Sequence, residues 1–314
     1  MSPQPAPADL HFPLIEWFAR HGRELPWRAP STGPWAILVC EVMSQQTPVA
    51  RVAPAWTAWM ERWPTPTDLA SASPAEVIVA WDRLGYPRRA LRLQECARAI
   101  AENHGGEVPS DRAALLALPG VGPYTADAVL AFAFGKRSVV LDTNIRRVLA
   151  RWHGSALPAP SQTRAEEARA DSFVPDDDAL AASWNAAIME FGALICTARS
   201  PKCEDCPMQH ACEWFQGGRP EDEHAATRRT QPWHGTHRQA RGLVMGRLRK
   251  GPTTGAQLAS STSLTEARLT EAISSLLDDG LIESLPVSKP AATPDATGPS
   301  AVGNHLATTY RLPE

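Results

Sequence analysis

Four of the six cysteines lie within 17 residues, and this cluster constrains the fold more than any other feature of the sequence. Cys196, Cys203, Cys206 and Cys212 have the spacing C-x6-C-x2-C-x5-C. Thiolates this close repel and oxidise unless a cation organises them, and both tetrahedral zinc and iron–sulfur clusters use such ligands. Zinc fingers usually show two distant C-x2-C pairs, whereas one short pair between longer arms suits a larger cubane. We therefore expect a metal site here.

The N-terminus and the composition indicate a globular protein without a targeting signal. The segment MSPQPAPADLHF has neither a basic stretch nor a long apolar one, and no 18-residue apolar run occurs elsewhere. We therefore expect a cytoplasmic, nucleoid-associated protein in which disulfides are rare, with Cys40 and Cys96 in the core. The net charge of −3 argues against a broadly basic nucleic-acid binder but allows a local basic surface.

Helical periodicity recurs through the first 215 residues and predicts a mainly α fold. The pattern within residues 10–27 stops at Gly22. Further helices are expected at 35–47, 50–62, 74–83, 87–104, 111–117, 123–134, 142–152, 163–172 and 178–195. Convincing β alternation does not occur before residue 230. The polar residues 218–237 have no periodicity and are predicted to be a linker.

The C-terminal region, residues 238–314, has the element order of a winged helix. Three helical patterns at 238–250, 254–260 and 263–280 precede two strand candidates, LIESLPV and HLATTYRL. The third helix would be the recognition helix, yet it carries four acidic residues against Arg268. We therefore consider a packing or protein-contact role as well supported as DNA reading.

A glycine-containing turn, LPGVGPYTADAVL at residues 118–130, separates two helical segments. Gly120 and Gly122 allow positive φ and a close backbone approach, and Pro123 suits the first turn of the next helix. The free amides at that helix start can bind an anion, and a DNA phosphate is the obvious one. Taken alone, however, an ordinary helix hairpin is the commoner explanation.

Asp142 follows one helix later, in LDTNIRRVLAR, where it can cap the next helix. Together the hairpin, this Asp and the cysteine cluster resemble the helix–hairpin–helix DNA glycosylase superfamily, in its endonuclease III and MutY branch. The resemblance runs from about Leu25 to Cys212. It implies two lobes: an iron–sulfur lobe of residues 1–32 with 139–217, and a six-helix lobe of residues 33–138. It also implies a [4Fe–4S] cluster on the four clustered cysteines.

One position of the hairpin decides the reaction type. Superfamily members that combine glycosylase and lyase activity carry Lys in the pattern GVGxKTA, whereas this chain has Tyr124 in GVGPYTA and no Lys before Lys136. Schiff-base β-elimination needs an amine. The resemblance therefore implies a monofunctional hydrolase that uses water, without strong lyase activity.

The stretch EVMSQQT resembles the MutY pattern EVMLQQT, and LPWR, LGYPRRALRL and MEFGALICT agree with that family. The resemblance implies base excision repair, with excision of adenine opposite 8-oxoguanine or guanine after base flipping. Glu41 would be the acid that protonates the leaving adenine. Asp142 would stabilise the oxocarbenium ion. Tyr124 would hydrogen-bond near Asp142, and Asn144 would help to hold Asp142 or the water.

The remaining matches imply contacts to double-stranded DNA that carries the mispair. Gln45 and Gln46 would face the minor groove or the partner base, and Tyr86 would be the wedge beside that base. Further expected contacts are Gly120 and Gly122 in the hairpin, Trp27, Arg28 and Glu190 at the pocket, and Arg88 and Arg89 on phosphates. Arg92 could meet phosphates together with Arg88 and Arg89, whereas Arg146 and Arg147 are weaker phosphate candidates. We expect a monomer that does not contact membranes.

Some positions depart from the family pattern. Ser44 replaces a Leu expected near the adenine, Pro87 replaces a Tyr, and Cys40 stands where Ser is usual. Residues 238–314 are too few for the Nudix-like domain of many members and lack its FSH motif. The preference for 8-oxoguanine over guanine therefore stays open.

Two other functions compete with adenine excision. A mismatch thymine glycosylase shares the Tyr-containing hairpin and the Asp, but its pattern lacks Glu41. A catalytically silent DNA-binding module would keep the hairpin and the cluster as a scaffold. The joint presence of Glu41, Tyr124, Asp142 and Asn144 speaks against the silent module.

Overall fold

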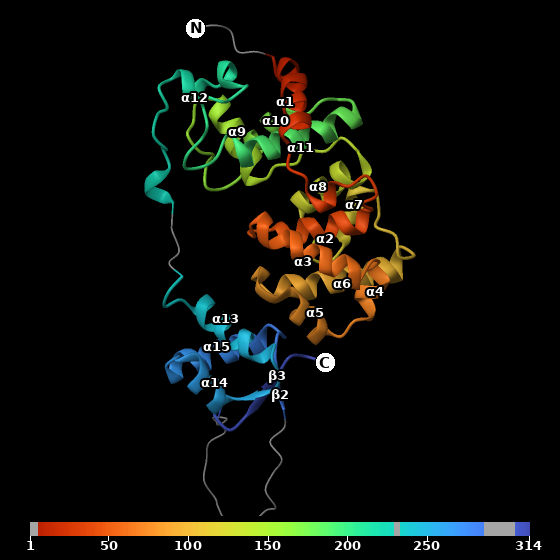
Figure 1. The fold of residues 1–314 in the computed structure, drawn as a ribbon, viewed down its shortest axis with the longest axis vertical. Helices are drawn as coiled ribbons and strands as arrows, with labels where there is room; N and C mark the ends of the chain where they lie inside the picture. The colour runs from red at the N-terminus through yellow and green to blue at the C-terminus, as the bar shows by residue number, and fades with distance from the viewer. Residues whose placement is uncertain (1–5, 229–232, 286–304) are drawn as a thin grey trace, which may run out of the picture. The chain divides into compact units, whose positions relative to one another are not determined.

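The computed structural model describes residues 6–228, 233–285 and 305–314. Its elements group into two compact units, shown in their chain order in Figure 1. Unit 1 is formed by Met1–Thr65 and Ala99–Arg229, and unit 2 by Pro66–Arg98 and Thr230–Glu314. The chain therefore leaves unit 1 after its third helix and returns to it near the end of α6.

Unit 1 is helical, as the sequence predicts. Its helices are α1 (Pro7–His21), α2 (Pro34–Ser44), α3 (Val49–Arg62), α7 (Arg112–Ala117), α8 (Pro123–Phe134), α9 (Thr143–Trp152), α10 (Arg164–Phe173), α11 (Asp178–Leu194) and α12 (Glu213–Gln216). Short 3-10 turns are η1 (Pro26–Arg28), η3 (Gln209–Ala211) and η4 (Ala225–Thr227). In the part of this unit that the structure describes, no strand occurs, so the mainly α class is confirmed.

The buried helix α11 forms the centre of one core of unit 1, packed against α1 and α9. Leu14, Val148 and Phe191 are fully buried there. A Cβ added at Gly192 would lie 2.8 Å from Cβ of Asn144, which is closer than real side chains approach. Glycine at this position therefore lets α11 lie directly against the start of α9, where two predicted catalytic residues are found.

Unit 2 joins three helices from the middle of the chain to the C-terminal region. These are α4 (Pro66–Ser71), α5 (Pro74–Trp81) and α6 (Arg88–Asn103), with η2 (Asp82–Leu84) between the last two. The C-terminal elements are α13 (His237–Leu248), β1 (Thr253–Thr254), α14 (Gly255–Thr262), α15 (Glu266–Asp278), β2 (Glu283–Leu285) and β3 (Thr309–Arg311). The strands form an antiparallel sheet of order β1-β3-β2.

The predicted winged-helix order of the C-terminal region is present, with one strand more than expected. Tyr310 of β3 pairs with Thr253 of β1 on one side and with Ser284 of β2 on the other. The strand β1 has only two residues, which are too few to show alternation. The sheet and the three helices thus enclose a small hydrophobic core.

Residues 66–98, which we expected in a six-helix lobe, group with the C-terminal region in this structure. The physical reason is a shared core: Ile78 of α5 is fully buried among side chains of α13, α14 and α15, including Val244, Leu258 and Ile273. Arg249 also donates to the carbonyl oxygen of Ile78 at 3.4 Å. The C-terminal region is therefore built onto the corner formed by α5 and α6.

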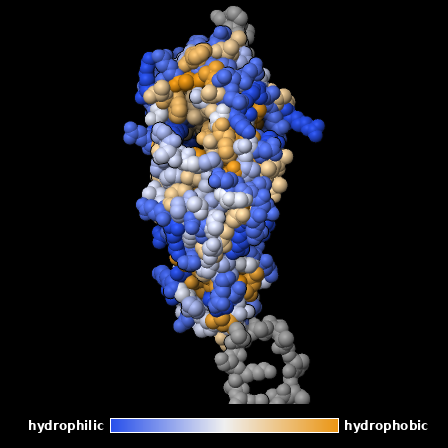
Figure 2. Space-filling model, turned by 90° about the vertical axis from the view of Figure 1, so that its right-hand side faces the viewer, coloured by the Kyte–Doolittle hydropathy of each residue, from blue (hydrophilic) through white to orange (hydrophobic). Residues whose placement is uncertain are grey.

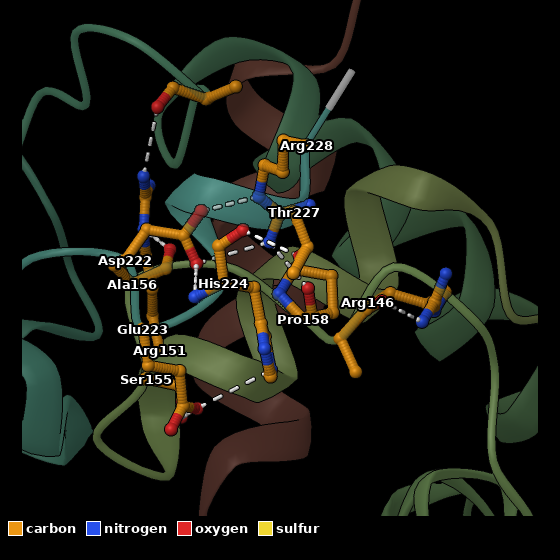
Figure 3. Close-up of polar contacts among 12 residues, drawn as sticks. Arg146, Arg151, Ser155, Ala156, Pro158, Asp222, Glu223, His224, Thr227 and Arg228 are labelled. Carbon is orange, nitrogen blue, oxygen red and sulfur yellow. Dashed lines mark hydrogen bonds and ion pairs between the residues drawn. The ribbon is translucent and has the colours of Figure 1, made fainter.

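The first part of the predicted linker, up to residue 228, is structured and is fastened to unit 1 (Figure 3). Arg228 forms an ion pair with Asp222 and donates to the carbonyl oxygen of Pro158 at 2.7 Å. Ser155 donates to Glu223 at 3.3 Å. Because polar contacts of this kind produce no hydrophobic periodicity in the sequence, the sequence predicted only a linker here. Residues 229–232 of that stretch lie outside the described part.

In the described segments, no helix is long and apolar enough to cross a membrane. On the face drawn in Figure 2, hydrophobic residues form scattered areas among hydrophilic ones. This finding concerns only the described helices.

Candidate active site

Glu41 is an acid inside an apolar helix, as its sequence context predicts. Its neighbours Cys40 and Val42 on α2 are buried, and Glu41 itself is only 9% exposed. The hydroxyl of Tyr124, on α8, donates a hydrogen bond to Oε2 of Glu41 at 3.0 Å. The helices α2 and α8 pack together and thereby bring the hairpin tyrosine to the acid.

The pKa of Glu41 is raised to about 7, a value suited to an acid that works near neutral pH. Burial is the main cause, because it penalises the charged carboxylate. The hydrogen bond from Tyr124 lowers the pKa, and the negative charge of Asp142 raises it. Burial together with this neighbouring charge outweighs the hydrogen bond.

Tyr124 was expected to hydrogen-bond near Asp142. Its hydroxyl donates to Glu41, whose pKa is raised by the charge of Asp142. Burial and the charges of Glu41 and Asp142 raise the pKa of Tyr124 well above its usual value, so the hydroxyl keeps its proton and acts as a donor. The tyrosine thus stabilises the charged form of Glu41.

Asp142 is the N-cap of α9, and this capping role from the sequence analysis is present. Its Oδ1 accepts from the backbone N–H of Ile145 at 2.6 Å, and its Oδ2 accepts from the amide of Asn144 at 2.7 Å. Burial raises the pKa of Asp142, while these two hydrogen bonds oppose that shift. Both oxygens are therefore held in a defined orientation.

Asn144 is itself held by Arg147, which ties it to the cysteine-rich segment. Arg147 donates to Oδ1 of Asn144 at 2.9 Å, to the carbonyl oxygen of Gly192 at 2.6 Å and to that of Cys196 at 2.7 Å. Arg147 is 8% exposed, and Arg146 forms a bidentate pair with Glu166. Both arginines, weak phosphate candidates from sequence, thus have internal partners.

The glycine hairpin between α7 and α8 only partly matches its prediction. Gly120 has φ of +77° and needs glycine for its backbone. Gly122, the N-cap of α8, has φ of −96°, and a Cβ added there would meet nothing within 4 Å. Gly122 thus has neither a positive φ nor a close neighbour among the described residues, and the open space beside it leaves room for a phosphate.

The two glutamines lie at the end of α2, one turn after Glu41. Gln45 donates to the hydroxyl of Thr125 at 3.4 Å, which directs it to the start of α8. Gln46 is exposed and has φ of +53°, an uncommon conformation outside glycine. Ser44 is half-buried, and its hydroxyl lies 3.8 Å from Sγ of Cys40.

Tyr86 and the two arginines after it belong to unit 2. Tyr86 is 40% exposed and has φ of +49°. Arg88 pairs with Asp279 at 3.0 Å. Arg89 donates to the carbonyl oxygens of Leu84 and Gly85, and burial lowers its pKa to about 10. Arg89 thus organises the backbone before Tyr86, a role that the sequence analysis missed.

Glu190, expected at the pocket, is the centre of an ion-pair group. It is 1% exposed, accepts from Arg23 at 2.6 and 2.7 Å, and accepts from Arg28 at 3.0 Å. Burial alone would raise the pKa of Glu190, but the two guanidinium groups outweigh it and hold the pKa at about 2. Arg23 was missed from sequence, since it precedes the LPWR motif. Trp27, on η1, makes an edge contact with Trp56.

The four clustered cysteines line one pocket, together with Arg151, Phe191 and Trp214. None of these four cysteines forms a disulfide. The chemistry of four clustered thiols fits an iron–sulfur cluster, which binds them as thiolates and cross-links the loop. Cys40 and Cys96 are core residues, as predicted.

Comparison with known proteins agrees with this geometry. Residues 39–170 match the HhH-GPD superfamily of base excision DNA repair proteins. Residues 196–212, the segment from the first to the last clustered cysteine, match the iron-sulfur binding domain of endonuclease III. These four cysteines are therefore the ligands of an iron–sulfur cluster, and zinc is set aside. The chain belongs to the helix–hairpin–helix class of DNA glycosylases.

Within that class, the chain belongs to the adenine DNA glycosylase family. It is 48% identical over 272 residues to the adenine DNA glycosylase of Mycolicibacterium smegmatis. This match covers 86% of this chain and 91% of that protein. The enzyme of Mycobacterium tuberculosis is 46% identical over 86% of this chain and 88% of its own. A match of 272 residues is longer than residues 1–237, so it extends into the C-terminal region.

Two solved structures share the fold of part of the chain. A thermostable thymine-DNA glycosylase has a TM-score of 0.61 at 30% identity and covers 67% of this chain and 97% of its own. A non-covalent endonuclease III–DNA complex has a TM-score of 0.58 at 26% identity and covers 69% and 100%. The mainly helical glycosylase fold with its iron–sulfur domain is thus confirmed.

Proposed function

We propose that this enzyme hydrolyses the N-glycosidic bond of adenine mispaired with 8-oxoguanine or guanine in double-stranded DNA. The observation that carries the proposal is a buried carboxylic acid, Glu41, with a pKa near neutrality and a hydroxyl donor on its Oε2. Family membership supplies adenine as the base. The acid supplies the means to make adenine a neutral leaving group.

The first step is the protonation of adenine by Glu41. Adenine leaves poorly as an anion, and a proton at N7 makes it a neutral leaving group. With a pKa of about 7, a substantial fraction of Glu41 is protonated at physiological pH. Glu41 is only 9% exposed, and this burial limits the access of water to its proton.

The second step is the stabilisation of the sugar. As the C1′–N9 bond breaks, positive charge develops on the deoxyribose ring, and a fixed carboxylate on its face lowers the barrier. Asp142 suits this role because Ile145 and Asn144 orient its oxygens without adding a positive charge. Water then completes the hydrolysis, and no lysine before Lys136 is available for a lyase step.

Flipping the adenine costs a few kcal/mol, and protein groups must fill the gap it leaves. Gln46 and Tyr86 are suited to this, since both are exposed and both have an uncommon positive φ. Strained backbone of this kind is concentrated at functional sites. The open N-terminus of α8 at Gly122 would hold a phosphate of the same strand.

A second candidate is excision of thymine from T:G mispairs. The thymine/uracil-DNA glycosylase of Pyrobaculum aerophilum is 36% identical over 65% of this chain and 90% of its own. Adenine is favoured because the mycobacterial adenine enzymes match over a larger share of the chain with higher identity. The presence of Glu41 also favours adenine, because thymine is a pyrimidine and has no N7 to protonate.

The test is a panel of end-labelled duplexes containing A:8-oxoguanine, A:G, T:G or thymine glycol, incubated with the enzyme and then treated with hot alkali. Strand breaks only at adenine are expected. Breaks at the thymine of T:G would contradict the proposal, and no breaks at all would favour a silent DNA-binding module. Breaks that appear without alkali would contradict the monofunctional mechanism.

A further inference from the structure

We infer that Arg238, in the C-terminal region, is a positioning residue for Tyr86 and thereby for the base opposite the excised adenine. The guanidinium of Arg238 lies over the ring of Tyr86, 4.5 Å from its centroid. The inference rests on the proposed role of Tyr86 as the wedge at the mispair. It assigns to the C-terminal region a part in the reaction that its acidic helix α15 did not suggest.

The backbone before Tyr86 is fixed within its own segment. Trp81 donates to the carbonyl oxygen of Gly85 at 2.8 Å, and Arg89 donates to that same oxygen at 3.0 Å. The carbonyl oxygen of Tyr86 accepts from the N–H of Arg89 at 2.9 Å. These bonds hold Tyr86 at its positive φ, so the place where its side chain leaves the backbone is defined.

The ring of Tyr86 is held differently, by cations. The guanidinium of Arg89 lies 5.7 Å from the centroid of the Tyr86 ring, and that of Arg238 lies closer, at 4.5 Å. A guanidinium over an aromatic face is attracted by the ring quadrupole. Since 40% of Tyr86 is exposed, removal of Arg238 would leave the ring with the more distant Arg89 contact and more freedom to move.

Arg238 is itself held by the C-terminal region. Its guanidinium also lies 5.2 Å from the centroid of Trp233, whose indole lies beside Gly242, one turn later on α13. Thr236 caps the start of α13 through the N–H of Gln239. The order Tyr86, Arg238, Trp233 is thus a stack of ring, cation and ring.

Asp279, at the end of α15, connects the α13 helix to the segment after Tyr86. It accepts from Arg241 of α13 at 2.5 Å and from Arg88 of α6 at 3.0 Å. Arg88, which we expected on a phosphate, therefore joins the C-terminal region to α6. With Ile78 in the shared core, this bridge keeps Arg238 in register with Tyr86.

The consequence is a division of labour in which the C-terminal region acts through Tyr86. The acidic α15 carries a bridging carboxylate, and its apolar side, which includes Leu269 and Ile273, is buried. The region therefore needs no base-reading helix of its own to influence excision. It orients the side chain that stays beside the partner base.

A double-mutant cycle tests this with the full-length, cluster-loaded protein. Single-turnover excision of adenine from an A:G duplex is measured for wild type, Arg238→Ala, Tyr86→Ala and the double variant. Arg238→Ala should slow excision about two- to fivefold, the range of an exposed cation–π contact. It should have no further effect when Tyr86 is already Ala. An equal fall in both backgrounds would overturn the inference, since Arg238 would then act independently, as a phosphate contact does.

Two further variants separate the contact from charge. Arg238→Lys keeps a cation and should recover part of the rate. Lys250→Ala removes one exposed positive charge from the same region and should leave the rate unchanged. A loss with Lys250→Ala as large as that with Arg238→Ala would contradict the inference. A wild-type protein that excises no adenine would refute the proposed function, whereas excision with an additive cycle would refute only the role of Arg238.

A spectroscopic measurement tests the contact without any activity. The chain has three tyrosines, so the protein labelled with 3-fluorotyrosine gives three ¹⁹F signals, and the one lost in Tyr86→Phe is Tyr86. Arg238→Ala should shift the Tyr86 signal and leave those of Tyr124 and Tyr310 in place. An unchanged Tyr86 signal would overturn the inference.

Discussion

The hydroxyl of Tyr124 donates a hydrogen bond to Oε2 of Glu41 at 3.0 Å, and this bond joins the glycine hairpin to the proposed catalytic acid. It opposes the effect of burial, which alone would push the pKa of Glu41 higher still. Together the two influences hold the pKa at about 7. An acid needs such a value to be protonated often enough and still give its proton away.

Replacement of Tyr124 by Phe should raise the pKa of Glu41, because the bond to the charged form is lost. A hydrogen bond worth about 1 kcal/mol corresponds to about 0.7 pKa unit. Excision requires protonated Glu41, so the rate falls as pH rises through this pKa. The falling limb of the single-turnover pH profile should therefore move to higher pH in Tyr124→Phe. A limb that moves to lower pH would contradict this role of Tyr124.

Replacement of Glu41 by Gln should make the fold relatively more stable at alkaline pH. The pKa of Glu41 is raised from 4.5 to about 7 on folding. Its favourable contribution is therefore complete below pH 4.5 and is lost as pH rises through about 7. The stability difference between Glu41→Gln and wild type should grow by about 2 kcal/mol from pH 5 to pH 8. Urea unfolding followed by tryptophan fluorescence measures this difference in the free energy of unfolding. A difference that does not change with pH would show that folding does not raise the pKa of Glu41.

Replacement of Glu190 by Gln should destabilise unit 1, because Arg23 and Arg28 lose the carboxylate that both share. Breaking a buried ion pair costs about 3–5 kcal/mol, and the two arginines are partly exposed, so about 2 kcal/mol is expected. The control is Glu16→Gln, which breaks an exposed pair with Arg20 and should cost less than about 1 kcal/mol. Equal losses of unfolding free energy in the two variants would show that Glu190 stabilises unit 1 no more than an exposed ion pair does.

Replacement of Cys203 by Ser should prevent stable assembly of the iron–sulfur cluster, because one of four thiolate ligands is missing. The purified wild-type protein should be brown with absorbance near 400 nm, and the variant should lose that absorbance. Cys96→Ser is the matched control, since Cys96 is buried in the core away from the pocket lining. Loss of absorbance in the control, or its retention in Cys203→Ser, would contradict the ligand assignment.

Helix positions in unit 1 were largely predictable from the sequence. The expected helices at 50–62 and 123–134 correspond to α3, Val49–Arg62, and α8, Pro123–Phe134. Both have a proline at or just before their first residue, and α8 ends at a left-handed glycine, Gly135. Local sequence sets such ends. The short helix α4, Pro66–Ser71, was missed, whereas the equally short α7, Arg112–Ala117, was expected because Asp111 marks its start.

The site was predictable in its members but not in its connections. A motif places Glu41, Tyr124 and Asp142 at their positions, yet it does not identify Glu41 as the hydrogen-bond acceptor of the tyrosine. The grouping of Arg23 with Glu190 joins residues 167 positions apart. Such partners depend on how α11 packs, and local sequence patterns do not predict packing between residues so far apart in the sequence.

The most direct test of the account is single-turnover excision of adenine from an A:8-oxoguanine duplex by wild type and by Glu41→Gln. Gln has the shape of Glu41 but no proton to give, so the rate should fall at least about a hundredfold. Duplex affinity, measured in parallel by fluorescence anisotropy, should be retained. Excision by Glu41→Gln at a rate close to that of wild type would contradict the claim that Glu41 is the acid.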